Sequence, residues 1–196
     1  MKYVIGLDEV GRGSLAGPVV VAAVLIPKGL RIMNYELGIM KDSKKVNSQK
    51  REKWFRFFKN HPDVLYTLAR VYPKKIDQIN ISNAANLAAL HAYERLVSGI
   101  IYKVPDVYLD GGLYLGGGKN RIPAKTVIRG DEKITAIKIA SIIAKVSRDK
   151  FMARLAKKYP KYNFETHKGY GTKRHIQVIK KFGPLIVHRR SFLRFI

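Results

Sequence analysis

The chain opens with two runs of apolar, largely β-branched residues. Residues 3–8 read YVIGLD and end in an acid, and residues 19–26 read VVVAAVLI without a polar position. Val and Ile favour strands, and an uninterrupted apolar run is typical of a strand buried on both faces. We therefore predict two strands, joined by a glycine-rich connection over residues 11–18.

The remainder of the chain alternates between helical and strand-like patterns. Apolar residues at helical spacing predict helices over residues 48–59, 83–98, 134–150, 149–158 and 173–182. Short apolar runs predict further strands over residues 65–71, 107–110 and 126–129. This order is typical of an α/β fold, and we expect antiparallel pairing between the early strands and parallel pairing between the later ones.

Composition excludes several classes of protein. The chain has 196 residues, 46% of them hydrophobic, which is enough for a packed core and argues against disorder. It has no cysteine and therefore no disulfide framework. Its longest apolar stretch, residues 18–27, is far too short to span a membrane. We expect a globular protein of the cytoplasm.

The charge balance is strongly basic. Lys and Arg number 38 against 14 Asp and Glu, so the formal net charge is +24. Such an excess points to a polyanionic partner, most often nucleic acid, with an anionic membrane surface as the other candidate. Residues 150–196 carry 13 basic residues and one acid, with aromatic residues interleaved. This favours a nucleic-acid surface built largely by the C-terminal segment.

Four of the few acids stand at predicted strand ends: Asp8, Glu9, Asp110 and Asp131. Ligands of α/β sheets bind at such ends, and clustered carboxylates need cations to offset their repulsion. Oxygen ligands suit Mg²⁺ or Mn²⁺, and a pair of such ions can hydrolyse a phosphodiester. Any one of these acids could equally be an ordinary turn or cap residue.

Asp8 and Glu9 raise a geometric question. Neighbours on a strand point to opposite faces, so both side chains reach one metal only if the strand breaks there. Gly11 permits such a break. The alternative is that Glu9 contributes its main-chain carbonyl.

Three loops carry further candidates. Gly11, Arg12 and Gly13 let the backbone approach a ligand closely and place an arginine beside it, although they could form a plain tight turn. The DSKK segment at residues 42–45 presents two ammonium groups, or merely solvated charge. Tyr170 lies between two glycines, where it could stack on a base or sugar or simply occupy a turn.

These segments together resemble the ribonuclease HII family, the type 2 ribonucleases H. The resemblance rests on DEVGRGSLAGPVV at residues 8–20, followed in the family's order by four shorter blocks. These are DSKK at 42–45, ASIIAKVSRD at 140–149, KGYGT at 168–172 and HRRSF at 188–192. The match covers nearly the whole chain.

The resemblance implies a ribonuclease H-like α/β fold, with a mixed central sheet flanked by helices. It divides the chain into a catalytic domain over residues 1–155 and a basic, helical substrate-binding extension over residues 156–196. It implies hydrolysis of the RNA strand of RNA–DNA hybrids by two metal ions, Mg²⁺ or Mn²⁺. It also implies cutting on the 5′ side of single ribonucleotides in duplex DNA, leaving a 3′-OH and a 5′-phosphate. We expect a monomer with no membrane partner.

The resemblance also implies roles for single residues. The four active-site carboxylates, which hold the metal, are Asp8, Glu9, Asp110 and Asp131. The residues that read the ribose 2′-OH and its phosphates are Gly11, Arg12 and Gly13, and Tyr170 stacks on the sugar beside an RNA–DNA junction. Lys44 and Lys168 contact phosphates. A long glycine-rich loop follows Asp110, which makes Asp106 the nearby rival for the third carboxylate.

Three alternatives stay open. The related ribonuclease HIII carries an extra N-terminal domain, for which a first strand at residue 3 leaves no room. A non-enzymatic RNA-binding protein would show the same charge but would not need acids at strand ends. A DNA-junction nuclease of similar fold would cut an all-DNA substrate.

Overall fold

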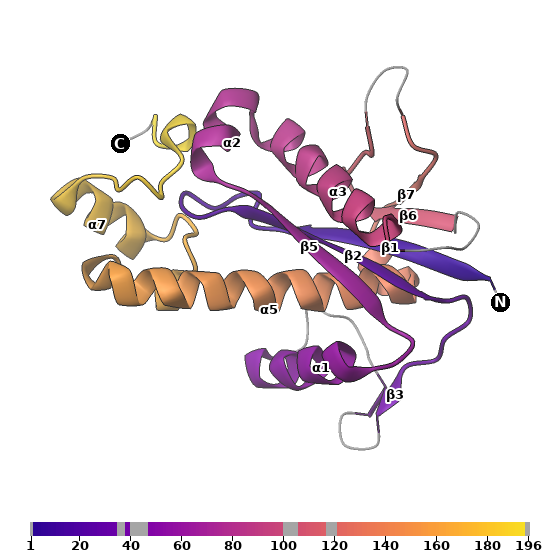
Figure 1. The fold of residues 1–196 in the computed structure, drawn as a ribbon. Helices are drawn as coiled ribbons and strands as arrows, with labels where there is room; N and C mark the ends of the chain where they lie inside the picture. Colours follow the sequence, from indigo (N-terminus) through magenta and orange to yellow (C-terminus); the bar gives the residue numbers. More distant parts are fainter. Residues whose placement is uncertain (1, 35–37, 40–46, 100–105, 117–120, 195–196) are drawn as a thin grey trace.

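A mixed five-stranded sheet forms the centre of the protein (Figure 1). The computed structural model describes residues 2–34, 38–39, 47–99, 106–116 and 121–194. The strands of the sheet are β1 (Tyr3–Val10), β2 (Val19–Pro27), β5 (Leu65–Val71), β6 (Asp106–Asp110) and β7 (Lys125–Val127). They lie in the order β5-β2-β1-β6-β7. β2 is antiparallel to β1 and β5, whereas β1–β6 and β6–β7 are parallel, which confirms the expected pairing.

Helices cover both faces of this sheet (Figure 1). One face packs against α3 (Ile81–Val97), preceded by the short α2 (Pro73–Ile79). The other packs against α5 (Thr135–Lys158), with α1 (Ser48–Asn60) beneath it. Because β2 is covered on both sides, its residues from 19 to 26 are all buried, which is why its sequence shows no polar position.

Small residues bring the helices close to the sheet. The face of α3 toward the sheet is mostly alanine, which lets the helix backbone approach the strands. Gly6 of β1 lies against the start of α5, where a Cβ would meet the backbone of Ala136 and Ile137 at 2.4 Å. The sequence of β1 therefore sets how closely the first turns of α5 pass over it.

The helices predicted over residues 134–150 and 149–158 are one continuous helix, α5, of 24 residues. The prediction of two was wrong because two helical patterns that overlap without a Gly or Pro have nothing to separate them. The last predicted strand is also shorter, since Arg129 adopts a left-handed conformation (φ 54°) ahead of the one-turn helix α4 (Gly130–Lys133). Its last two residues, 128 and 129, lie outside β7. The small hairpin β3 (Met33–Asn34) and β4 (Gly38–Ile39) has no counterpart in the prediction.

The C-terminal segment folds back onto the glycine-rich connection after β1. It contains η3 (Pro160–Tyr162), α6 (Phe164–His167), α7 (Lys173–Phe182) and η4 (Arg190–Phe192). Isolated bridges join Ser14 to Tyr170 and Ala16 to His188. The apolar cluster beneath includes Leu15, Met152 and Phe164, so it draws on both sides of residue 155. The division at residues 155 and 156 falls inside α5 and stays a prediction.

Among the described residues, no helix combines the length and the apolar character that crossing a bilayer requires.

Candidate active site

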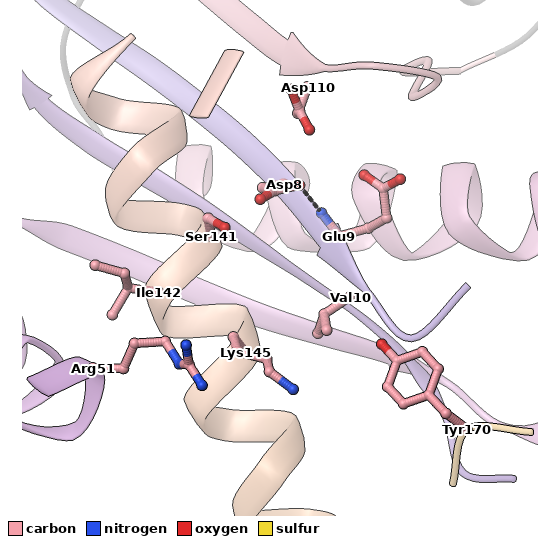
Figure 2. Close-up of a pocket in the computed structure, with 9 residues that line it drawn as sticks. All are labelled: Asp8, Glu9, Val10, Arg51, Asp110, Ser141, Ile142, Lys145 and Tyr170. Atoms are coloured by element: carbon pink, nitrogen blue, oxygen red, sulfur yellow. Dashed lines mark hydrogen bonds between the residues drawn. The ribbon is translucent and has the colours of Figure 1, made fainter. Parts of the chain in front are cut away.

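Three of the predicted carboxylates line one pocket at the ends of β1 and β6 (Figure 2). Asp8 and Glu9 come from β1 and Asp110 from the last position of β6. The pocket has a volume of about 410 Å³. It is completed by Val10, Arg51, Ser141, Ile142, Lys145 and Tyr170. Parallel strands end on the same side of a sheet, which is why acids 102 residues apart in sequence meet here.

Both Asp8 and Glu9 reach this pocket, although they are neighbours on one strand. The pairing of β1 with β6 ends at Leu7 and Leu109, so the two acids lie beyond the last paired residues on that side. The main-chain N–H of Glu9 donates to Asp8 Oδ1 at 2.7 Å, which holds the Asp8 carboxylate against its own strand. β1 does not break at these acids, because it stays paired with β2 as far as Val10, so the expectation that a break is needed was wrong. Both acids line the pocket from a continuous strand, and Glu9 need not act through its carbonyl.

The surroundings of Asp8 disfavour its charged form. Asp8 is 6% exposed, and burial raises its pKa well above the usual value. The charges of Glu9 and Asp110 raise the same pKa further, against a smaller opposing effect from a hydrogen bond with Ser141. A cation beside these oxygens would attract the negative charge and so lower the pKa again.

Glu9 is held on one side only. Its Oε1 lies 3.3 Å from Nη1 of Arg12, whereas the buried Oε2 has no hydrogen-bond partner within the described part of the chain. Burial raises the pKa of Glu9, the arginine lowers it, and Asp110 raises it again. A buried carboxylate oxygen without a hydrogen-bond donor is energetically costly. A cation or a hydrogen-bond donor that bound beside Glu9 Oε2 would remove this cost.

Asp110, and not Asp106, lines the pocket together with Asp8 and Glu9. Asp106 lies at the opposite end of β6, where it is about half exposed and forms an ion pair with Lys28 at 3.6 Å. Asp110 Oδ1 accepts a hydrogen bond from the N–H of Gly130 at 2.7 Å. Asp131 follows directly in α4 and is fully buried, but it does not line the pocket. Its place among the metal ligands stays a prediction.

The loop after β1 lies beside the carboxylates. Gly11 is buried with φ +91°, and a Cβ there would meet Nε of Arg148 at 2.3 Å, so glycine is required. Arg12 contacts both Glu9 and Ser82, the latter at 3.3 Å from its Nη2. Gly13 is exposed, with open space where a side chain would stand.

Tyr170 and the two predicted lysines lie in different places. Tyr170 is half-buried on the wall of the carboxylate pocket, with Arg148 5.4 Å from its ring centre. Lys168 lines a neighbouring hollow, which shares Arg51 with the carboxylate pocket. Lys44 and the rest of the DSKK segment lie outside the described residues.

Sequence reasoning assigned no role to Arg51, Ser141 and Lys145 at this pocket. Ser141 and Lys145 stand four residues apart on α5, a spacing that places them on one face of the helix. That spacing, inside a block already noted for its resemblance, was a usable signal. Arg51 comes from α1, and no local pattern distinguishes it from the other cations of that helix.

The donor set fits a hard divalent cation. The carboxylates supply oxygen ligands only, their mutual repulsion raises the pKa of Asp8, and Glu9 Oε2 is unpaired. Among the described residues, no group of three or more His, Asp or Glu side chains lies arranged so that it could hold a metal ion by itself. This agrees with Mg²⁺ chemistry, in which one or two carboxylates bind the ion and water or substrate oxygens fill the other positions.

Comparisons with known proteins agree with this geometry. The sequence model of the family described as Ribonuclease HII matches residues 5–195. Ribonuclease HII of Caldicellulosiruptor saccharolyticus is 44% identical over 193 residues, covering 98% of this chain and 88% of that protein. The crystal structure of ribonuclease H2 from Pyrococcus horikoshii superimposes with a TM-score of 0.69 at 26% identity, covering 96% and 93% of the two chains.

A more distant neighbour supports the fold. It is Bst-RNase HIII in complex with Mn²⁺, with a TM-score of 0.71 at 20% identity, covering 93% of this chain and 63% of that one. The family match spans almost every element described above, and the carboxylate pocket lies within it. The chain belongs to the ribonuclease HII family and is a ribonuclease H enzyme.

Proposed function

We propose that this enzyme hydrolyses the RNA strand of RNA–DNA hybrids and cuts duplex DNA on the 5′ side of single embedded ribonucleotides. The products would carry a 3′-OH and a 5′-phosphate. The observation that carries the proposal is the pocket in which three carboxylates meet on a chain of net charge +24. Acids are costly beside a polyanion unless cations cover them, so their grouping at a nucleic-acid surface favours metal-dependent phosphodiester chemistry.

The carboxylates would hold Mg²⁺ or Mn²⁺, two ions during catalysis. Asp8, Glu9 and Asp110 lie on the pocket, and Asp131 lies in the turn fastened to Asp110. When bound, the ions activate water and stabilise charge on the leaving oxygen. The protein's part is to gather the carboxylates in one pocket and to hold the scissile phosphate against them.

Two groups on the pocket wall would position the nucleic acid. Gly11, Arg12 and Gly13 would approach the ribose 2′-OH and its phosphates, because a glycine backbone can come close to a ligand. The ring of Tyr170 would lie against the next sugar, where a 2′-OH would crowd it. A ribose on one side of the phosphodiester and a deoxyribose on the other would satisfy both groups.

Cations around the pocket would bind phosphates along the substrate. Lys168 and Lys44 are the two positions that the family resemblance supplies. Arg51 and Lys145 add positive charge on the pocket wall, although Lys145 also pairs with Asp149 at 2.9 Å. The exposed cations of α7 would extend this surface. We further propose that the enzyme acts as a cytoplasmic monomer.

Cleavage-site mapping tests the proposal. Three substrates are compared in Mg²⁺, in Mn²⁺ and with chelator: duplex DNA with one ribonucleotide, an RNA–DNA hybrid, and an all-DNA duplex. We expect metal-dependent cutting of the first two, with the single cut of the first on the 5′ side of the ribonucleotide. Cleavage in chelator would exclude the metal mechanism, and cleavage of the all-DNA duplex would favour a junction nuclease instead.

A further inference from the structure

Two arginines are completely buried in this protein. Arg148 and Arg189 both have 0% exposure, and neither forms an ion pair with a carboxylate of the described residues. A buried cation without a counter-charge is costly and needs strong hydrogen bonds to replace its water. Both guanidinium groups obtain these bonds from main-chain carbonyl oxygens, mostly of the loop that follows β1.

Arg189 bonds the two peptide units at the start of that loop. Its Nη2 donates to Gly11 O and its Nη1 to Arg12 O, each at 2.7 Å. Nε and Nη2 also donate to Gly17 O, at 3.1 and 2.9 Å. Distances of 2.7 Å are typical of strong charge-assisted bonds. One side chain thus fixes three carbonyl groups of a loop that lies more than 170 residues earlier in the sequence.

The bonds from Arg189 to Gly11 O and Arg12 O determine where the N–H groups of the next residues point. In a trans peptide the C=O and the following N–H are directed oppositely, and the described residues contain no cis peptide. Gly11 O and Arg12 O face Arg189, so the N–H groups of Arg12 and Gly13 face away from it. Neither N–H donates to another backbone group in the described part of the chain. Successive N–H groups directed to one side form a site for anionic or hydroxyl oxygens.

Arg189 also increases the strength of these donors. A cation on a carbonyl oxygen polarises the whole peptide unit and makes its N–H a better donor. Burial, and then the nearby charge of Arg148, lowers the pKa of Arg189 to about 9, which leaves the group charged at neutral pH. The charge behind the loop therefore persists under working conditions.

Arg148 provides a contrast. It donates to the carbonyl oxygens of Ala16, Pro18 and Lys168 at 2.9–3.0 Å. Two of the N–H groups that follow these carbonyls already have partners: Gly17 donates to Val187 O and Gly169 to Nδ1 of His167. Arg148 thus secures the loop without directing either of the donors at Arg12 and Gly13.

We infer that Arg189 is a positioning residue for ribose recognition: it orients and polarises the N–H groups of Arg12 and Gly13 toward the substrate. This inference rests on the proposed function, because it assumes that this loop contacts the ribose and its phosphate. Its substrate class is a ribonucleotide within a duplex, whose 2′-OH and phosphate oxygens accept hydrogen bonds.

Arg189→Lys tests the inference, with Arg148→Lys as the matched control. Both substitutions remove a buried guanidinium fork and keep a positive charge. Affinity is measured in chelator, so that nothing is cut, for duplex DNA with one ribonucleotide and for the all-DNA duplex. Arg189→Lys should lower the ratio of the two affinities about tenfold, the effect of one good hydrogen bond. Arg148→Lys should lower thermal stability yet change the ratio less than Arg189→Lys does, although Arg148 also lies over the ring of Tyr170.

An equal decrease of the ratio in both variants, or an unchanged ratio in Arg189→Lys, would overturn the inference. If Arg189→Lys does not fold, the wild-type protein still decides by NMR. The amide signals of Arg12 and Gly13 should shift further on addition of the ribonucleotide duplex than on addition of the all-DNA duplex, which lacks the 2′-OH. If these amide signals do not respond to the ribonucleotide, the inference is likewise overturned.

A different outcome would contradict the proposed function and not the role of Arg189. If the wild-type enzyme neither prefers nor cuts the ribonucleotide duplex, ribose recognition itself is wrong. The substrate-free amide signals then decide whether Arg189 orients the loop, because Arg189→Lys should shift the Arg12 and Gly13 signals and Arg148→Lys should not.

Discussion

Asp110 accepts a hydrogen bond from the main-chain N–H of Gly130 at 2.7 Å, which fastens the end of β6 to the turn that carries Asp131. The bond uses Oδ1 only and leaves the second oxygen of Asp110 available to the pocket. Two acids 21 residues apart are in this way kept in a fixed relation, although only one of them lines the pocket.

Replacing Asp110 by Asn should abolish cleavage while the fold persists. The amide oxygen can still accept from Gly130, whereas the negative charge that would hold a metal is removed. We expect turnover of an RNA–DNA hybrid to fall at least about a hundredfold. Asp106→Asn is the control on the same strand, and it should stay close to wild type because its exposed ion pair with Lys28 contributes little. Loss of activity in Asp106→Asn alone would reverse the assignment.

Asp8→Asn should make the metal-free protein more stable. Burial and neighbouring carboxylates raise the pKa of Asp8 in the folded state, so its stabilising contribution is present at acid pH and lost as pH rises through that pKa. At neutral pH the carboxylate is therefore a cost that the amide lacks. We expect the melting temperature to rise by roughly 2–4 °C, the shift that about 1 kcal/mol produces at this size. Cleavage should be lost at the same time.

Divalent cations should stabilise wild type more than Asp8→Asn. Binding to the folded state raises the melting temperature with ligand concentration. Calorimetric scans with increasing Mn²⁺ would measure the difference, with the same scans in Na⁺ at equal ionic strength as control. Equal stabilisation of both proteins would mean that Asp8 is not a ligand.

Tyr170→Ala should slow cutting at a single embedded ribonucleotide more than cutting of a long hybrid, where no junction need be recognised. The ring lies on the wall of the pocket, and removing an aromatic stacking surface costs about 1–3 kcal/mol, which corresponds to roughly fivefold to 150-fold in rate. Tyr170→Phe keeps the ring and should retain the preference. The measurement is the cleavage rate of each substrate. If Tyr170→Ala slows both by the same factor, the tyrosine serves general packing and does not sense the junction.

The basic C-terminal segment should set part of the salt dependence of binding. Deleting it would remove the buried Arg189 and Ile179, so substitution of exposed cations is the cleaner test. In α7 we choose Lys173, Lys180 and Lys181, all exposed. Changing all three to Gln should reduce the log–log slope of affinity against salt by about 0.9 for each phosphate that is no longer neutralised. Lys2 directly precedes β1, and the N-terminus lies on the opposite side of the molecule from α7 (Figure 1). Lys2→Gln should therefore leave the slope unchanged.

Stability should fall as pH drops from about 6.5 to about 4 because of two buried histidines. Nε2 of His175 and of His188 lie 3.1 Å apart, and burial lowers both pKa values to about 4. The unfolded chain binds protons near pH 6.5 and the folded chain does not, so the stabilisation is complete above that pH and is lost toward pH 4. Each histidine contributes up to roughly 3 kcal/mol.

Melting temperatures between pH 7 and pH 5 would measure this decrease in stability. The melting temperature of His175→Gln should decrease less between pH 7 and pH 5 than that of the wild type, whether the variant is more or less stable at pH 7. His91→Gln, at an exposed position of α3, should show the wild-type decrease. A decrease of wild-type size in His175→Gln would locate the pH dependence elsewhere.

The elements with local sequence signals could be predicted before the fold was known. The unbroken apolar run of β2 marks a strand covered on both faces, and alanines at helical spacing mark α3. The acids at the ends of β1 and β6 could also be chosen, because parallel strands bring their carboxyl ends to one edge of a sheet. Even the choice between Asp106 and Asp110 follows once the strand is known to run toward Asp110.

Which cations are buried could be learned only from the folded chain. In sequence, Arg148 and Arg189 look like two more members of a basic, solvated segment, yet both are fully buried against the loop after β1. Likewise, Arg51 reaches the pocket from α1, and Asp131 is buried beside the pocket without lining it. Burial depends on which distant segments pack together. Arg148 and Arg189 contact loop residues at least 130 positions away, and no periodic pattern in the sequence indicates such a contact. The bonds that hold the loop after β1 are therefore properties of the folded chain.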